Sequence, residues 1–143
     1  MTAIDYIQSL ERIDFRIERK KDKIERLEIL AQNLSSKPFD SDRVKTSGNK
    51  DRIGDLAIKI MEEKQSLARL IEETEEKRDY VSEQIDNMDN LIFSKIIYYR
   101  HVEKKSYEDI TTMLDDEKEY SVQSVKNMHT KAIKEFNKTF IMP

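Results

Sequence analysis

The residues best suited to chemistry lie between Ser121 and Lys138. Apolar side chains at Val125, Ala132 and Phe136 have helical spacing, so they share one face of a helix and leave the polar side chains on the other. Glutamine and asparagine amides match the adenine edge in the DNA major groove, and lysines contact phosphates. The segment has a net charge of +3. The predicted DNA contacts are Gln123, Ser124, Lys126, Asn127, Thr130 and Lys131.

Two histidines, His101 and His129, could suggest a metal or catalytic site. The sequence has no cysteine, and neither histidine has carboxylates at a ligand spacing. We find no phosphate-binding loop, nucleophile constellation or carboxylate dyad either. We therefore expect surface or core roles for both histidines, with no metal, no cofactor and no enzymatic activity.

Short helices must position the polar set. Four poor helix-interior residues, Asp86, Asn87, Asp89 and Asn90, predict a bend or a new helix start. An apolar helix from Leu91 to Arg100 is expected to follow. Ser106-Tyr107-Glu108-Asp109 has the form of a capping box, which predicts a helix starting at Ser106. Ser121 predicts the last start, with Tyr120 packing on Val125. Three such helices fit the helix-turn-helix plan, whose last helix enters the major groove.

Two longer helices precede them. Eight of nine positions are apolar in the series 6, 10, 13, 17, 20, 24, 27, 31 and 34, and nine of twelve in the series from 53 to 92 that includes Ala57, Lys64 and Ile71. Such 4-3 spacing predicts amphipathic helices. Leu56, Leu70 and Leu91 widen the second stripe. Lys20, Lys64 and Arg78 interrupt the stripes, either fixing register or extending their charged ends to solvent.

The breaks between these patterns set the predicted organisation. Ser35 to Asn49 holds proline, glycine and small polar residues, so we expect a loop there, with a short turn around Val44 or a functional flap. The predicted fold is all-α: a long antiparallel, coiled-coil-like helical hairpin over residues 1–88, then a small three-helix domain with a helix-turn-helix over residues 89–143.

Composition limits the class of protein. Apolar residues make up 37% of the 143-residue chain and charged residues 38%, while two glycines and two prolines are too few for the turns of a β-rich fold. The net charge of −3 gives no global attraction for polyanions, so nucleic-acid binding must be local. No long apolar run or signal-peptide start is present. We expect a cytoplasmic protein with no membrane partner.

Residues 96–110, Tyr120 to Lys126 and Ala132 together resemble the region 4 helix-turn-helix of bacterial sigma factors. With Asp42 to Ser47 and the long helices, the chain is similar to phage and prophage regulators of the ArpU and RinA kind. It departs from that pattern at His101, where a tyrosine is usual, and in the longer turn from Asp115 to Tyr120. The resemblance implies a bacterial host cell, late-gene control and contact with host RNA polymerase.

We therefore expect a phage-type transcriptional regulator that binds double-stranded promoter DNA through its last helix. The hairpin would supply a homo-oligomer contact, with a dimer favoured, or a grip on polymerase. One alternative is a DNA-packaging protein of the small terminase type, for which a ring of eight or more subunits would be diagnostic. The other is a helical module that inhibits or recruits a partner protein, in which case substitutions at Gln123 or Asn127 would leave DNA binding unaffected.

Overall fold

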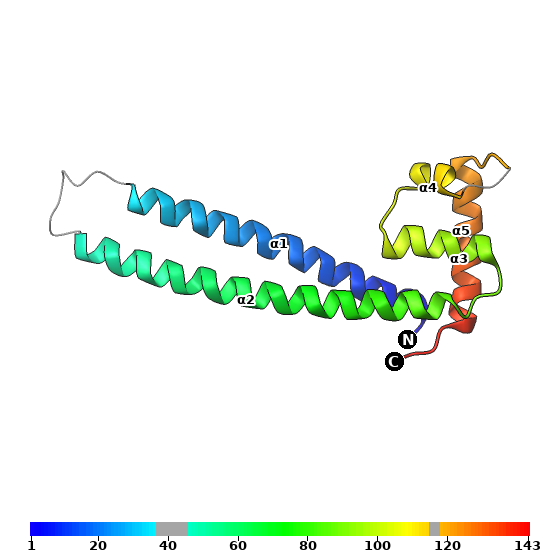
Figure 1. The fold of residues 1–143 in the computed structure, drawn as a ribbon, viewed down its shortest axis with the longest axis horizontal. Coiled ribbons are helices and arrows are strands. Elements are labelled where there is room, and N and C mark those ends of the chain that lie inside the picture. The colour runs from blue at the N-terminus through cyan, green and yellow to red at the C-terminus, as the bar shows by residue number, and fades with distance from the viewer. Residues whose placement is uncertain (37–45, 115–117) are drawn as a thin grey trace. The chain divides into compact units, whose positions relative to one another are not determined.

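The structure is a computed structural model that describes residues 1–36, 46–114 and 118–143. Side chains are described for all of these residues except 46–49. Its elements are α1 (Ala3–Ser35), α2 (Thr46–Ile85), α3 (Leu91–Ile97), the π-helical turn η1 (Tyr98–Val102), α4 (Tyr107–Met113) and α5 (Val122–Thr139) (Figure 1). The described residues form no strand, which confirms the all-α prediction. None of the described helices combines the length and apolarity needed to cross a bilayer.

The described residues pack into two compact units, and both α1 and α2 contribute to each of them. One unit joins Met1–Arg12 to Glu75–Pro143, and the other is Ile13–Thr74. We call them the terminal unit and the hairpin unit. The terminal unit is larger than the predicted domain 89–143, because Ala3, Ile7 and Val81 are buried in the same apolar cluster as Ala132 and Phe136.

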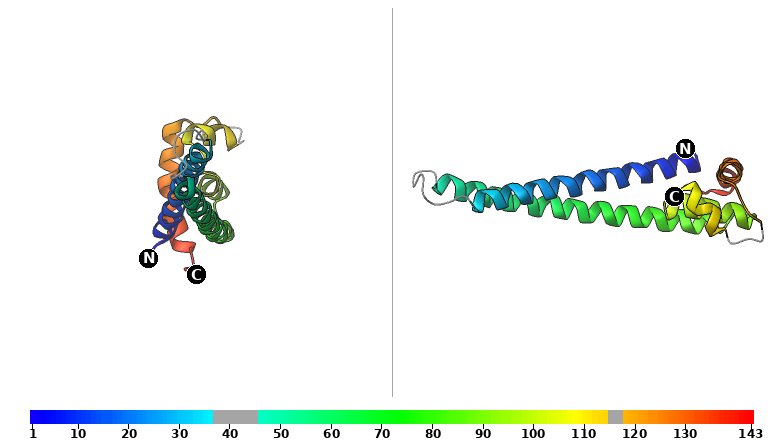
Figure 2. Two further views of the ribbon diagram at one scale, coloured as in Figure 1. Left: turned by 90° about the vertical axis from the view of Figure 1, so that its left-hand side faces the viewer. Right: turned by 90° about the horizontal axis from the view of Figure 1, so that it is seen from above.

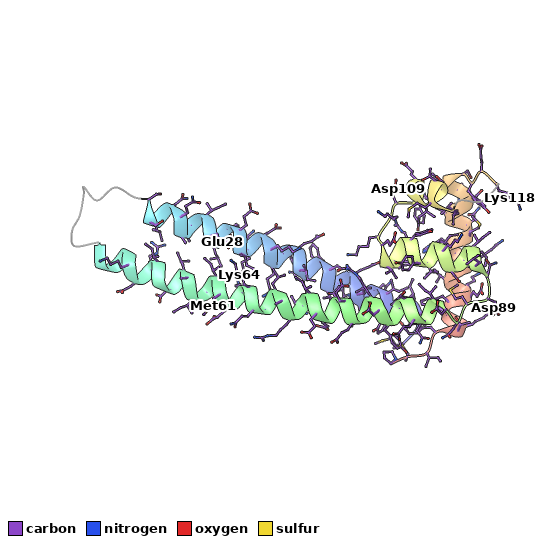
Figure 3. All side chains as sticks on the ribbon, viewed as in Figure 1. Glu28, Met61, Lys64, Asp89, Asp109 and Lys118 are labelled. Carbon is purple, nitrogen blue, oxygen red and sulfur yellow. The ribbon has the colours of Figure 1, made fainter. Side chains whose placement is uncertain are left out.

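The hairpin unit consists of α1 and α2 lying side by side and antiparallel over Ile13–Thr74 (Figures 1 and 2). Ile13 and Ile17 pack against Leu70 in a small apolar cluster. Further along the pair, Glu63 accepts hydrogen bonds from Lys20 Nζ at 2.9 Å and Lys23 Nζ at 3.0 Å. These two hydrogen bonds lower the pKa of the Glu63 carboxyl to about 2. A second bridge joins Lys64 to Glu28 at 3.0 Å (Figure 3).

The inward face of α2 is rotated from the predicted series in the hairpin unit. Ala57, Lys64 and Ile71 are exposed, whereas Leu70 is buried and Leu56 and Glu63 are half-buried. The predicted 4-3 series placed the first three of these residues on the seam and was wrong there. The reason is that α2 carries two neighbouring rows of apolar residues, either of which could face α1. The sequence pattern favoured the row with Ala57, Lys64 and Ile71, whereas the row with Leu56 and Leu70 faces inward. Leu91, predicted to widen the stripe, is 67% exposed.

The predicted loop between the two long helices is only partly described. Helix α1 ends at Ser35 as expected, but α2 already begins at Thr46, so the sequence prediction of a loop through Asn49 was too long. The turn or flap around Val44 lies outside the described residues. Residues 115–117, the first half of the longer turn predicted from Asp115 to Tyr120, also lie outside the described residues.

The terminal unit holds the short helices. Helix α5 packs against both α3 and α4. Helix α2 ends at Ile85, and Asn90 caps α3 by accepting a hydrogen bond from Phe93 N, which confirms the predicted bend. Ser106 caps α4 by accepting from Asp109 N at 3.1 Å, also as predicted. A second apolar cluster contains Ile96, Ile110, Leu114 and Val125, with Tyr120 against it.

Candidate nucleic-acid interface

Helix α5 begins where the sequence predicted. The backbone of Ser121 is extended, and its hydroxyl oxygen accepts a hydrogen bond from Ser124 N at 3.0 Å. The Ser121 hydroxyl also donates to Ser124 Oγ at 2.9 Å. Ser124 is half-buried at this cap. It therefore helps to start the helix, unlike the other predicted contacts, whose side chains extend from the helix surface.

The buried face of α5 determines which residues point outward. Val125, Ala132 and Phe136 are all 0% exposed. Because these three residues fix the rotation of the helix, the polar residues between them face away from the core. Five of the six predicted DNA contacts are accordingly exposed, namely Gln123, Lys126, Asn127, Thr130 and Lys131.

Two of the exposed side chains are joined to each other. Gln123 Nε2 donates a hydrogen bond to Asn127 Oδ1 at 3.1 Å, across one turn of α5. Thr130 uses its hydroxyl to donate to Lys126 O at 3.2 Å, so its hydroxyl hydrogen is engaged within the helix. Gln123, Asn127 and Thr130 therefore form a polar surface whose side-chain orientations are set in the free protein.

Sequence reasoning missed Lys134 and Lys138, which are exposed on α5. Lys134 follows Gln123, Asn127 and Thr130 at steps of four, three and four, so it continues the same surface row, which we call the α5 ridge. That spacing is visible in the sequence and could have identified it. The acid of this segment, Glu135, accepts hydrogen bonds from the backbone N–H groups of Asp89 and Asn90. Its carboxylate is thus committed to the turn before α3.

A second group of cations surrounds Tyr107. The Arg100 guanidinium lies 4.1 Å from the centre of the Tyr107 ring, and Lys126 Nζ lies 5.7 Å from it. Arg100 also donates to Lys105 O at 3.0 Å, across the connection in which Lys104 has a φ of 59°. Cation–π contact and this hydrogen bond hold the cations in place. Lys126 belongs to both this group and the exposed face of α5.

The two histidines come together inside the terminal unit. His101 Nε2 lies 2.8 Å from His129 Nε2, and the Tyr107 hydroxyl lies 3.4 Å from His129 Nδ1. Glu11 Oε1 is 3.8 Å from His101 Nδ1. Because a carboxylate only accepts hydrogen bonds, a proton on His101 Nδ1 suits the nearby Glu11. His101 Nε2 then accepts a hydrogen bond from His129 Nε2–H. His129 Nδ1 in turn accepts one from the Tyr107 hydroxyl. The contacts join η1, α4 and α5 at one point.

The environment of this pair opposes protonation. Burial lowers the pKa of His101 to about 4, and the neighbouring His129 and Arg100 add to the effect. Burial and Arg100 also lower the pKa of His129. Both rings are therefore neutral near pH 7. No group of three histidine or carboxylate side chains among the described residues could hold a metal ion. The sequence prediction gave the histidines no site role, and it did not foresee their contact.

Comparison of the chain with protein-family models, curated proteins and solved structures gives no match. The resemblance to phage regulators and to sigma region 4 therefore depends on the motif residues themselves. Of these, the structure describes 96–110, 120–126 and Ala132, whereas 42–45 lie outside the described residues.

Proposed function

We propose that this protein is a phage-type transcriptional regulator that binds promoter DNA through α5 and controls late genes. The observation that carries the proposal is the α5 ridge, whose residues are polar, exposed and not acidic. The one acid of residues 121–138, Glu135, is half-buried and hydrogen-bonded to the turn at Asp89 and Asn90. A helix with this surface suits the major groove, where amides contact base edges and lysines contact phosphates.

The charge distribution supports a weak, local mode of DNA binding. The whole chain carries −3, yet residues 121–138 carry +3, and Arg100 adds a cation that contacts the same Tyr107 ring as Lys126. Because few phosphates can be neutralised, affinity for random DNA should be low and should fall with rising salt. A regulator of this kind gains affinity by presenting more than one reading helix.

We propose that the hairpin unit joins two copies of the chain in a homodimer, so that the second copy supplies the second reading helix. We also propose that this unit contacts host RNA polymerase. Among the described side chains of this unit, six large apolar ones are exposed, including Met61 at 54% (Figure 3) and Phe15 at 59%. Where exposed apolar side chains gather into one patch, they form a surface suited to binding another protein. A dimer would also double the number of lysines facing the DNA.

The test is selection of bound DNA from a random pool by the full-length chain. The comparison variant is Lys131→Ala/Lys134→Ala/Lys138→Ala, and the matched control is Lys50→Ala/Lys59→Ala/Lys64→Ala on α2. We expect enrichment of one sequence family by the wild type and the control, and little enrichment by the α5 variant. Point variants are preferable to a chain ending at Met88, because Val81 and Ile85 share a core with Phe136. Absence of enrichment by the wild type would refute the proposal.

A further inference from the structure

We propose that Gln123 and Asn127 act as a single unit that recognises the major-groove edge of one adenine. The inference rests on the proposed function and adds the identity of the base. Its starting point is the 3.1 Å hydrogen bond between the two amides, formed while both side chains are exposed. Two exposed side chains that are already bonded lose less freedom on binding than two independent ones.

The bond leaves complementary groups unused. Gln123 donates through one N–H, so its Oε1 keeps full accepting capacity, and the Asn127 amide keeps its N–H donors. If the direction of the bond were reversed, the pair would still offer one carbonyl oxygen and one amide N–H group. The unit therefore presents an acceptor beside a donor in either arrangement.

Among the purines, adenine suits this pattern best. Its major-groove edge offers the N7 acceptor and the N6 amino donor, whereas guanine offers two acceptors, N7 and O6. Guanine would leave the unit's carbonyl facing O6 with no hydrogen between the two oxygens, and an unpaired buried acceptor is costly. The exposed lysines of α5 would meanwhile bind phosphates without distinguishing bases.

The first experiment is a double-mutant cycle on the DNA site obtained by selection. Gln123→Ala and Asn127→Ala should each weaken binding about 10- to 100-fold, the range for losing one bidentate base contact. If the two amides act as one unit, the double variant should bind no more weakly than the weaker single variant. Two independent contacts would instead multiply the two losses, and that result would overturn the inference.

The matched control uses Lys134, on the same ridge but outside the pair. Lys134→Ala should weaken binding to the selected site and to scrambled DNA by the same factor. Combined with Gln123→Ala, it should multiply the loss on the selected site. All these side chains are exposed, so the variants should keep the helical circular-dichroism spectrum of the wild type.

The second experiment changes the base and keeps the protein. Replacing the contacted adenine with 7-deazaadenine removes N7, and replacing it with unsubstituted purine removes the amino group; each should weaken wild-type binding about 10-fold or more. 2,6-Diaminopurine keeps the major-groove edge and should bind like adenine. Specific binding that ignores these changes would refute the adenine unit and leave the proposed function standing. Absence of any DNA binding would refute both.

Discussion

The hairpin unit and the terminal unit bury their apolar side chains to different degrees. In the terminal unit, Val81, Ile97, Val125 and Phe136 are all 0% exposed. In the described part of the hairpin unit, the most buried apolar residue is 6% exposed, a value shared by Ile13 and Leu70. Two helices meet along a line, so each side chain is covered from one direction only. A third and a fourth helix are needed to enclose a side chain completely.

The difference explains where charges are tolerated. In the hairpin unit, Lys20 and Glu63 lie beside the apolar seam with side chains 23% and 16% exposed, so water still solvates part of each. In the terminal unit, the side chain of His101 is 8% exposed, and this histidine is neutral instead of charged. Thin packing accepts an ion pair, whereas enclosed packing requires a neutral hydrogen-bonded group.

The largest effect is expected from the enclosed core. Phe136→Ala should lower the free energy of unfolding of the terminal unit by about 3 to 5 kcal/mol, because the cavity is closed on all sides. All six tyrosines (6, 80, 98, 99, 107 and 120) belong to this unit, and the sequence has no tryptophan. Urea unfolding followed by tyrosine fluorescence therefore reports on the terminal unit. A loss below about 1 kcal/mol would contradict the enclosed core.

A smaller effect is expected from the equivalent deletion in the hairpin unit. Leu70→Ala should cost about 2 to 3 kcal/mol, at the low end for such a change, since solvent can reach part of the space. The measurement is amide hydrogen exchange over residues 13–74. Ala68→Gly on the exposed side of α2 is a control that changes helix propensity by about 1 kcal/mol without touching the seam. Equal costs for Leu70→Ala and Phe136→Ala would remove the contrast between the units.

The two units should also respond to acid in different pH ranges. The pKa of His101 falls from 6.5 to about 4 on folding. Between these values the unfolded chain binds a proton that the folded chain does not, so stability falls as pH falls. Tyrosine-monitored unfolding should show a loss of about 2 kcal/mol between pH 7 and pH 5. The variant His101→Gln/His129→Gln should be less stable at pH 7 and should lack this dependence.

For the hairpin unit the range is lower. The pKa of Glu63 is depressed from 4.5 to about 2. Its contribution to stability is complete above pH 4.5 and is lost as pH falls toward 2. Hydrogen exchange over residues 13–74 should therefore be insensitive to the change from pH 7 to pH 5, after correction for the intrinsic rate. Loss of hydrogen-exchange protection over residues 13–74 between pH 7 and pH 5 would show that the two units lose stability in the same pH range.

The smallest effect is expected at Lys20. Lys20→Met should change stability by less than about 1 kcal/mol, because Glu63 keeps its bond to Lys23 and methionine covers the seam. The comparison variant, Glu63→Gln, should cost more, since it leaves two lysines close together without a carboxylate. Thermal unfolding by circular dichroism, with tyrosine fluorescence to separate the terminal unit, measures both. A larger loss for Lys20→Met would assign Lys20 a role in fixing helix register.

Local signals in the sequence predicted the parts of the fold that depend on neighbouring residues. The caps at Ser106 and Ser121, the helix start at Leu91 and the outward face of α5 follow from side-chain chemistry and helical spacing, and the structure confirms them. The candidate site follows to the same extent, because the exposure of Gln123 and Asn127 is set by the buried residues of their own helix.

The remaining features depend on contacts between distant residues. His101 and His129 are 28 residues apart, and His101 lies in the π-helical turn η1. Neither the contact nor the turn has a local sequence signal. The inward face of α2 was ambiguous because Leu70 and Ile71 are both apolar, and only packing against Ile13 and Ile17 selects Leu70. Cation contacts at Tyr107 likewise require the fold to bring Arg100 and Lys126 together.

Glu135 has a consequence for any attempt to strengthen the protein's hold on a polyanion. Neutralising this residue would make α5 more basic, yet its carboxylate is the group that fastens the chain at Asp89 and Asn90. Glu135→Gln would retain an oxygen acceptor there but would weaken the fastening, since a neutral acceptor binds less strongly than a charged one. Gains in attraction would therefore be traded against the anchoring of α3, and a sequence under selection for both would keep the acid.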